Sequence, residues 1–141
     1  MRIAMIGAGY VGLVSGACFA EFGVTVVCVD TDQAKIDRLM QGGIPIYEPG
    51  LDDMVRRQVE SGRLSFTAAI ADAVKGADAV FIAVGTPPRR FDRAADLSFI
   101  YQAARDVAAA MDGYTVIVAK STVPVGTARE IERIVREARP D

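Results

Sequence analysis

Short apolar runs alternate with amphipathic segments along the whole 141-residue chain. Runs such as Thr25–Val29, with the sequence TVVCV, are β-branched and uninterrupted, which is typical of strands buried on both faces of a parallel sheet. The segments between them place apolar residues three and four positions apart, which is the spacing of an amphipathic helix. The pattern predicts strands at 3–6, 25–29, 64–66, 77–84 and 115–119, and helices at 11–22, 32–40, 51–60, 70–74, 97–111 and 127–138.

This alternation predicts a doubly wound α/β domain, with a mostly parallel, Rossmann-like sheet and helices on both faces. Numbered along the chain, the five strands are expected to lie in the order 3-2-1-4-5. Residues 1–141 contain no internal repeat and no low-complexity linker, so we expect one domain. The residues expected to face the core from the second and last helices are Ile36, Leu39, Met40, Ile131, Ile134 and Val135.

Residues 6–16 read IGAGYVGLVSG and hold four glycines directly after the first predicted strand. Glycine destabilises both strands and helices, so each one needs a local reason. Gly7, Gly9 and Gly12 form the G-x-G-x-x-G pattern of dinucleotide-binding folds. In such folds they allow a tight turn, the approach of a diphosphate to the backbone, and close packing of helix on strand. Gly16, one helical turn later, is expected to be a further close-packing position.

The second predicted strand ends at Asp30, within the same strand–helix–strand unit as the glycines. An acidic residue at this position accepts hydrogen bonds from the adenosine ribose hydroxyls of NAD and repels the additional phosphate of NADP. We therefore predict NAD, although Lys35 and Arg38 lie near enough in sequence to accommodate a phosphate. The alternative for Asp30 is a helix cap, a role that Thr31 or Asp32 could also fill.

Two further loops follow predicted strands, VGTPP at 84–88 and KSTVPVGT at 120–127. Ligands of open parallel sheets bind outside the carboxyl ends of the strands, so both loops are expected to border the nucleotide. Ordinary turn chemistry explains the same residue types equally well. The candidate contacts in these loops are Gly85, Thr86, Pro87, Ser121 and Thr122.

Composition narrows the classes of function. Sixteen basic and eighteen acidic residues give a net charge of −2, which argues against nucleic acid as the main partner. The chain has no histidine, which excludes a Ser-His-Asp triad and the usual zinc sites within it, and no metal is expected.

Two cysteines provide no disulfide framework, which favours the cytoplasm. Cys18 and Cys28 lie in apolar segments and are expected to be unreactive. Glycines interrupt the uncharged stretch 3–20, so neither a signal peptide nor a membrane span is expected.

Six segments together closely resemble the amino-terminal, NAD-binding part of the UDP-glucose/GDP-mannose dehydrogenase family. In chain order they are MRIAMIGAGYVGLVSGACFAEFG, VDTDQAKIDRLMQGGIPIYEPGLDDMV, GRLSFT, ADAVFIAVGTP, ADLSFI and VAKSTVPVGT. The resemblance covers essentially the whole chain. Its segments PIYEPGL and STVPVGT are most similar to the UDP-glucose 6-dehydrogenase branch of the family.

The resemblance implies NAD-dependent oxidation of the C6 alcohol of a sugar nucleotide to a carboxylate, in two steps through a thiohemiacetal on a cysteine. Thr122 would also lie beside the reacting centre and help to position a water or the oxyanion. Glu48, in YEPGL, is expected to have a structural role, and the parent enzyme is expected to be a homodimer. Besides the glycines, the residues that the resemblance assigns to NAD are Tyr10, Val11, Asp30, Lys35, Thr86 and Thr122.

The family's catalytic cysteine, lysine, asparagine and aspartate belong to segments with no counterpart in these residues. The chain alone is therefore expected to bind NAD without turning over substrate, and a UDP-sugar to bind only in the full-length enzyme. Phe91-Asp92-Arg93-Ala94 replaces the family's usual Asp-Gly turn, which leaves the shape of the 88–95 loop open. Three alternatives also remain: a GDP-mannose or other UDP-sugar dehydrogenase, a non-catalytic nucleotide-binding module such as a redox sensor, and a scaffold that binds nothing.

Overall fold

The computed structural model describes residues 1–140, which form five strands and six helices. Every predicted element is present with the predicted type, and its ends differ from the prediction by at most two residues. The strands are β1 (Arg2–Ile6), β2 (Thr25–Val29), β3 (Leu64–Thr67), β4 (Ala79–Ile82) and β5 (Val116–Ala119). The helices are α1 (Tyr10–Glu21), α2 (Gln33–Met40), α3 (Leu51–Glu60), α4 (Ile70–Val74), α5 (Ser98–Ala110) and α6 (Thr127–Ala138).

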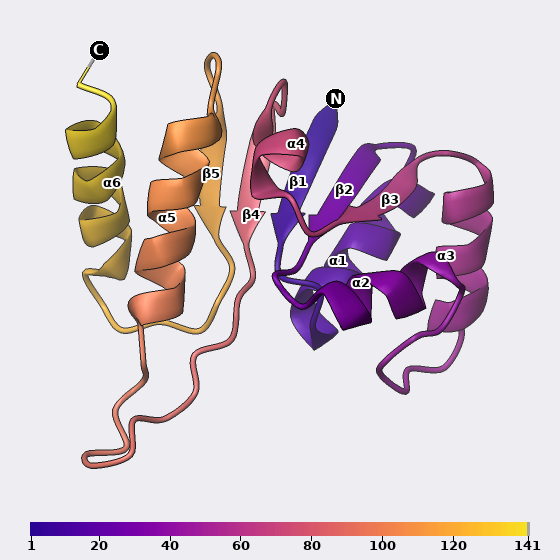
Figure 1. Ribbon diagram of the computed structural model, residues 1–141, viewed down its shortest axis with the longest axis horizontal. Helices are drawn as coiled ribbons and strands as arrows, with labels where there is room; N and C mark the ends of the chain where they lie inside the picture. Colours follow the sequence, from indigo (N-terminus) through magenta and orange to yellow (C-terminus); the bar gives the residue numbers. More distant parts are fainter. Residues whose placement is uncertain (141) are drawn as a thin grey trace.

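The five strands form one parallel sheet in the order β3-β2-β1-β4-β5, which confirms the predicted topology (Figure 1). The last residue of β1, Ile6, is level with Val29 of β2 and with Ile82 of β4. The loops that follow these three strands therefore leave the sheet side by side at its carboxyl edge. This register brings the glycine turn, Asp30 and the 83–88 segment to one place.

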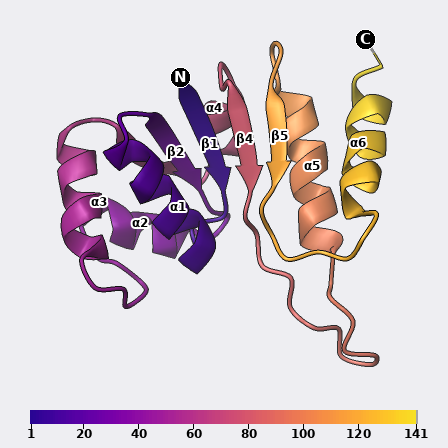
Figure 2. The same ribbon diagram turned by 180° about the vertical axis from the view of Figure 1, so that it is seen from behind.

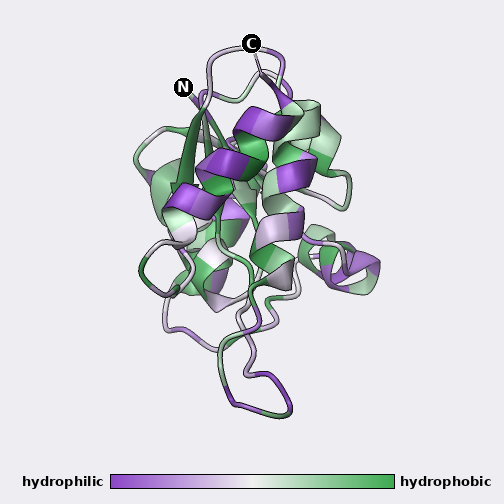
Figure 3. Cartoon of the chain, turned by 90° about the vertical axis from the view of Figure 1, so that its left-hand side faces the viewer, coloured by the Kyte–Doolittle hydropathy of each residue, from purple (hydrophilic) through white to green (hydrophobic). Residues whose placement is uncertain are grey.

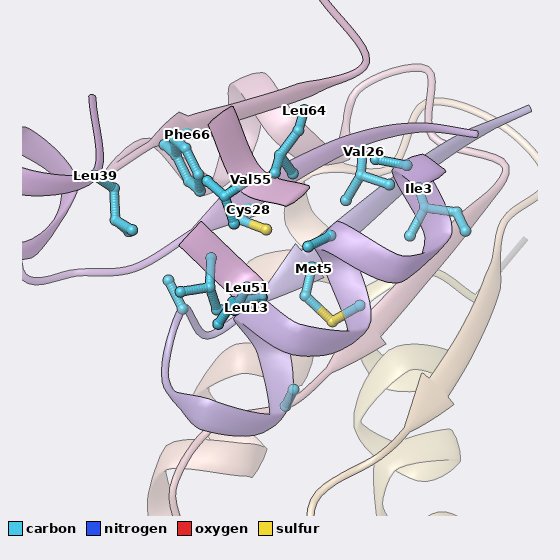
Figure 4. Close-up of a cluster of buried hydrophobic side chains, with 14 of the residues drawn as sticks. Ile3, Met5, Leu13, Val26, Cys28, Leu39, Leu51, Val55, Leu64 and Phe66 are labelled. Atoms are coloured by element: carbon cyan, nitrogen blue, oxygen red, sulfur yellow. The ribbon is translucent and has the colours of Figure 1, made fainter. Parts of the chain in front are cut away.

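Two apolar clusters, one on each face, hold the helices against the sheet. Residues of α1, α2 and α3 pack on one face, where Met5, Cys28 and Leu13 are fully buried (Figure 4). Residues of α4, α5 and α6 pack on the other face, around Val80 and Ile100. Figures 1 and 2 show α5 and α6 on one side of the sheet and α1 on the other. The expected double winding is thus confirmed.

Two details differ from the sequence prediction. Met40 is 64% exposed, although Ile36 and Leu39 are buried as predicted, because α2 ends there and the chain turns away, with Gly43 donating to the Arg38 carbonyl oxygen (2.7 Å). The prediction that the strands are buried on both faces is wrong for the two edge strands: β3 leaves Ser65 exposed, and β5 leaves Val116 46% exposed.

Helix α6 shows how the surface is formed. Ile131 and Ile134 are buried as predicted, and Val135 packs against the same cluster. Figure 3, viewed from the α6 side, shows hydrophilic bands alternating with hydrophobic ones along the helices nearest the viewer.

Within residues 1–140, no helix combines the length and the apolar character needed to cross a membrane.

The 88–95 loop is a narrow hairpin that projects beyond the carboxyl edge of the sheet (Figure 1). Pro88 and Ala95 form an isolated antiparallel bridge at its base. Arg93 adopts a positive φ of 56°, a left-handed conformation that glycine adopts more easily than any side chain. The turn at Arg93, directly after Asp92, is therefore left-handed although the residue is not glycine.

Candidate functional site

The G-x-G-x-x-G residues form the turn from β1 into α1. Gly7 has φ +108°, and a Cβ there would lie 2.5 Å from the Ala83 carbonyl oxygen. A Cβ on Gly12 would lie 1.8 Å from the Gly7 carbonyl oxygen, so only glycine lets α1 start this close to β1. A Cβ on Gly9, by contrast, would meet nothing within 4 Å. Gly7 and Gly12 are thus required by the fold, whereas Gly9 keeps a space open. A Cβ on Gly16 would lie 2.8 Å from Cys28 Sγ, which confirms the close packing expected there.

The amino end of α1 faces this turn without a side-chain cap. Gly9 is the capping residue, and its carbonyl oxygen accepts a hydrogen bond from the Leu13 N–H (2.9 Å). The first turn carries no acidic side chain. The first N–H groups of a helix have no partner within the helix, and the helix dipole makes this end positive. The turn therefore offers backbone donors to an anion.

Asp30 follows β2, and its carboxylate lies beside the glycine turn. Oδ2 accepts hydrogen bonds from the Ala8 N–H (3.1 Å) and the Lys35 ammonium (2.9 Å), and Oδ1 accepts one from the Asp32 N–H (3.0 Å). Burial alone raises the pKa of this carboxyl, but the hydrogen bonds from Asp32, Lys35 and Ala8 outweigh it and hold the pKa below the usual value. Asp30 is therefore an ionised acceptor. Asp32, not Asp30, caps α2 by accepting from the Lys35 N–H (3.2 Å).

A cavity of about 520 Å³ opens at this edge of the sheet, within the usual size range of small-molecule sites. The loops after β1, β2 and β4 all contribute to its lining. The open space at Gly9, the free N–H groups of α1 and the ionised acceptor Asp30 fit the diphosphate and ribose of a dinucleotide. The predicted contacts that line the cavity are Gly7, Gly9, Asp30, Lys35, Gly85 and Pro87.

The NAD-binding domain of the UDP-glucose/GDP-mannose dehydrogenase family matches residues 1–141. The chain belongs to this family. Its fold is that of the family's NAD-binding domain, and its cofactor is NAD. The family assignment and the geometry at Gly9 and Asp30 agree on the kind of ligand.

Relatives of this dehydrogenase domain are found among both sequences and structures. The UDP-glucose 6-dehydrogenase of Rhizobium meliloti (strain 1021) is 63% identical over 140 residues, which are 99% of this chain and 32% of that protein. TuaD of Bacillus subtilis (strain 168), also a UDP-glucose 6-dehydrogenase, is 52% identical over 97% of this chain and 30% of its own length. The crystal structure of a ternary complex of GDP-mannose dehydrogenase from Pseudomonas aeruginosa superposes with a TM-score of 0.94 at 34% identity, covering 100% of this chain and 33% of that one. The chain thus spans about a third of the length of these relatives.

Six predicted contacts of this dehydrogenase domain do not line the cavity: Tyr10, Val11, Gly12, Thr86, Ser121 and Thr122. Ser121 Oγ donates to the Val84 carbonyl oxygen (2.8 Å), and Thr86 Oγ1 donates to the Thr122 carbonyl oxygen (3.4 Å). These hydroxyls link the 84–88 and 120–127 loops, as turn chemistry alone would also require.

Tyr10 links the start of α1 to the loop between α2 and α3. Its hydroxyl donates to Glu48 Oε2 (2.7 Å); Tyr10 is exposed and Glu48 is partly exposed. The bond agrees with a structural role for Glu48 in the YEPGL segment. It also fixes the Tyr10 side chain beside the glycine turn.

Sequence reasoning missed one wall of the cavity. Four of the missed residues lie on α5, spaced three or four positions apart, so they form one stripe along that helix. The sequence holds one signal for this wall: Phe99 is a large apolar residue that lies outside the core-facing stripe of α5. In the structure its side chain is 54% exposed. The lining residues that were not predicted are Ile6, Val29, Thr31, Ala68, Ile70, Ala83, Val84, Phe99, Gln102, Ala103 and Asp106.

Neither cysteine lines the cavity. Cys28 is completely buried in β2, and burial raises the pKa of its thiol to about 12. A thiol with this pKa is almost entirely protonated at neutral pH and is therefore a poor nucleophile. Cys18 is partly buried on α1.

Proposed function

We propose that this chain supplies the NAD site of a UDP-glucose 6-dehydrogenase, which oxidises UDP-glucose to UDP-glucuronate while two NAD are reduced. The observation that carries the proposal is the 63% identity to the Rhizobium meliloti UDP-glucose 6-dehydrogenase across 99% of the chain. GDP-mannose dehydrogenase is the weaker candidate, because its Pseudomonas aeruginosa representative shares only 34% identity. The UDP-sugar substrate, a homodimeric parent and a cytoplasmic location belong to the same proposal.

In this proposal the chain binds and orients the cofactor. Gly7, Gly9 and Gly12 with the amino end of α1 hold the diphosphate, and Asp30 accepts hydrogen bonds from the adenosine ribose. Bound NAD supplies the hydride acceptor for the sugar carbon. The remaining contacts are assigned to Tyr10, Val11, Lys35, Gly85, Thr86, Pro87, Ser121 and Thr122, with Thr122 also positioning water or the oxyanion at the reacting centre.

The ion pair between Asp30 and Lys35 supports a preference for NAD over NADP. The Lys35 ammonium is 2.9 Å from Asp30 Oδ2, so the cation nearest to the ribose site is already paired. A 2′-phosphate would have to displace that pair and approach a carboxylate. Arg38, the other cation considered, lies exposed in the last turn of α2.

The substrate is tested by supplying the complete gene product with NAD and, separately, UDP-glucose, GDP-mannose and UDP-N-acetylmannosamine. We expect two NADH for each UDP-glucose consumed and no NADH from the other two sugars. The 141-residue chain alone is expected to bind NAD without producing NADH. Turnover of GDP-mannose in place of UDP-glucose would assign the chain to the other branch of the family.

Asp30→Ala is expected to weaken NAD binding about tenfold, because a ligand hydrogen bond to an ionised group is lost. Asp32→Ala is the matched control, since Asp32 caps α2 two residues further on and does not line the cavity. It is expected to cost about 1 kcal/mol of stability and to leave NAD affinity unchanged. Calorimetric titration of both variants with NAD and NADP makes the comparison. Equal NAD affinity in Asp30→Ala and wild type would remove the ribose assignment.

A further inference from the structure

We propose that Gln102 and Asp106 on α5 recognise the base edge of the dinucleotide and select adenine. The inference rests on the proposed NAD site, in which Asp30 accepts the adenosine ribose. The inference assigns a role to the α5 wall of the cavity, to which the proposed function gives none.

The cavity itself connects these residues to the ribose position. Asp30, Thr31 and Lys35 line it after β2, and Gln102 and Asp106 line it from α5. Ala68, Ile70 and Ala103 line the same cavity and are apolar. A base attached to a ribose at Asp30 therefore has apolar surface available for its flat faces and two polar side chains available for its edge.

Hydrogen bonds within α5 fix how the two side chains are oriented. Gln102 Nε2 donates to Asp106 Oδ1 at 2.9 Å. On its other side, Gln102 Oε1 accepts a long hydrogen bond from Arg105 Nη1 at 3.5 Å. Both contacts point the amide nitrogen of Gln102 toward Asp106. The amide keeps a second N–H, and within residues 1–140 no side chain donates to Asp106 Oδ2.

The pair thus presents one donor and one acceptor side by side. The edge of adenine carries the complementary groups, with a 6-amino donor next to the N1 acceptor. Hypoxanthine and guanine carry a 6-carbonyl acceptor next to an N1–H donor, which is the reverse order. An ionised carboxylate has no proton to donate to a carbonyl, so these bases are disfavoured at Asp106.

A surface helix pair is the simpler explanation for Gln102 and Asp106, because residues four apart on a helix often form hydrogen bonds. Two observations favour recognition. Both residues line the cavity, and Asp106 is only partly exposed although it is acidic. Asp53 and Arg56 on α3 are an example of an ordinary surface pair: both are exposed, and neither lines this cavity.

The test compares NAD with nicotinamide hypoxanthine dinucleotide, which differs only at the base edge, by calorimetric titration. Wild-type protein is expected to bind NAD about tenfold more tightly than the hypoxanthine analogue. Asp106→Asn is expected to reduce this ratio to about threefold or less, because an asparagine amide can donate to the 6-carbonyl. Asp53→Asn, the matched control, is expected to keep the wild-type ratio.

Gln102→Glu supplies an independent second variant, since it replaces the donor opposite N1 with an acceptor. It is expected to weaken NAD more than the hypoxanthine analogue, whose N1–H can donate to the new carboxylate. Equal binding of both dinucleotides by wild type, or an unchanged ratio in Asp106→Asn, overturns the adenine assignment and leaves the proposed function standing. Failure of wild type to bind either dinucleotide overturns the NAD site and this inference together.

Discussion

Gly12→Ala is expected to destabilise the domain by at least about 3 kcal/mol, although alanine is the better helix former by about 1 kcal/mol. The added Cβ would lie 1.8 Å from the Gly7 carbonyl oxygen and 2.8 Å from its carbonyl carbon. Both atoms belong to the backbone, so no rotamer change can relieve the overlap. Either α1 moves away from β1 or the turn between them reopens. Thermal or urea unfolding measures the loss.

Gly16→Ala is the informative comparison, because its Cβ would meet the Cys28 side chain rather than backbone. The sulfur can be removed, so Cys28→Ala is expected to restore part of the stability that Gly16→Ala loses, as a double-mutant cycle would show. No side-chain substitution is expected to rescue Gly12→Ala. A Gly12→Ala variant as stable as wild type would mean that α1 does not lie this close to the strand.

The architecture could be predicted because its signals are local. Uninterrupted apolar runs identify strands, and the glycines between β1 and α1 place a turn where only the backbone fits. Asp30 was found in the same way, from its position directly after a strand. These features depend on residues close together in the sequence, so the strand order is as predicted and half of the predicted contacts line the cavity.

The rest of the cavity depends on tertiary packing that the sequence pattern does not contain. Asp106 faces the same cavity as Asp30 only because α5 packs beside β4 and α4, with most of the domain lying between the two residues in sequence. Met40 and Val116 show the same limit for burial. An apolar residue at the right spacing is buried only where another element covers it, and the pattern does not say which element that is.

Gly7, Gly9 and Gly12 have the same sequence signature but different physical requirements. The fold needs two of them: one has a positive φ, and the other has no space for a Cβ. Gly9 has φ −78°, which any residue adopts, and open space around it. Folding alone therefore does not require glycine at position 9, which leaves ligand binding as the reason for it.

Gly9→Ala is accordingly expected to fold normally, within about 1 kcal/mol of wild type, and to bind NAD about a hundredfold more weakly. The added methyl group would enter the cavity that Gly9 lines, at the point where a diphosphate must approach the N–H groups of α1. Losing two charge-assisted hydrogen bonds there accounts for a change of this size. Urea unfolding and calorimetric titration with NAD measure the two quantities separately.

Gly113→Ala provides the matched control, because Gly113 also has no neighbour within 4 Å of a Cβ and no positive φ, but lies before β5 at the opposite edge of the sheet. Both variants add the same methyl group to open space, so only its location differs. We expect Gly113→Ala to keep wild-type NAD affinity. If Gly9→Ala bound NAD as Gly113→Ala does, the diphosphate would have to lie elsewhere, and the open space at Gly9 would need another explanation.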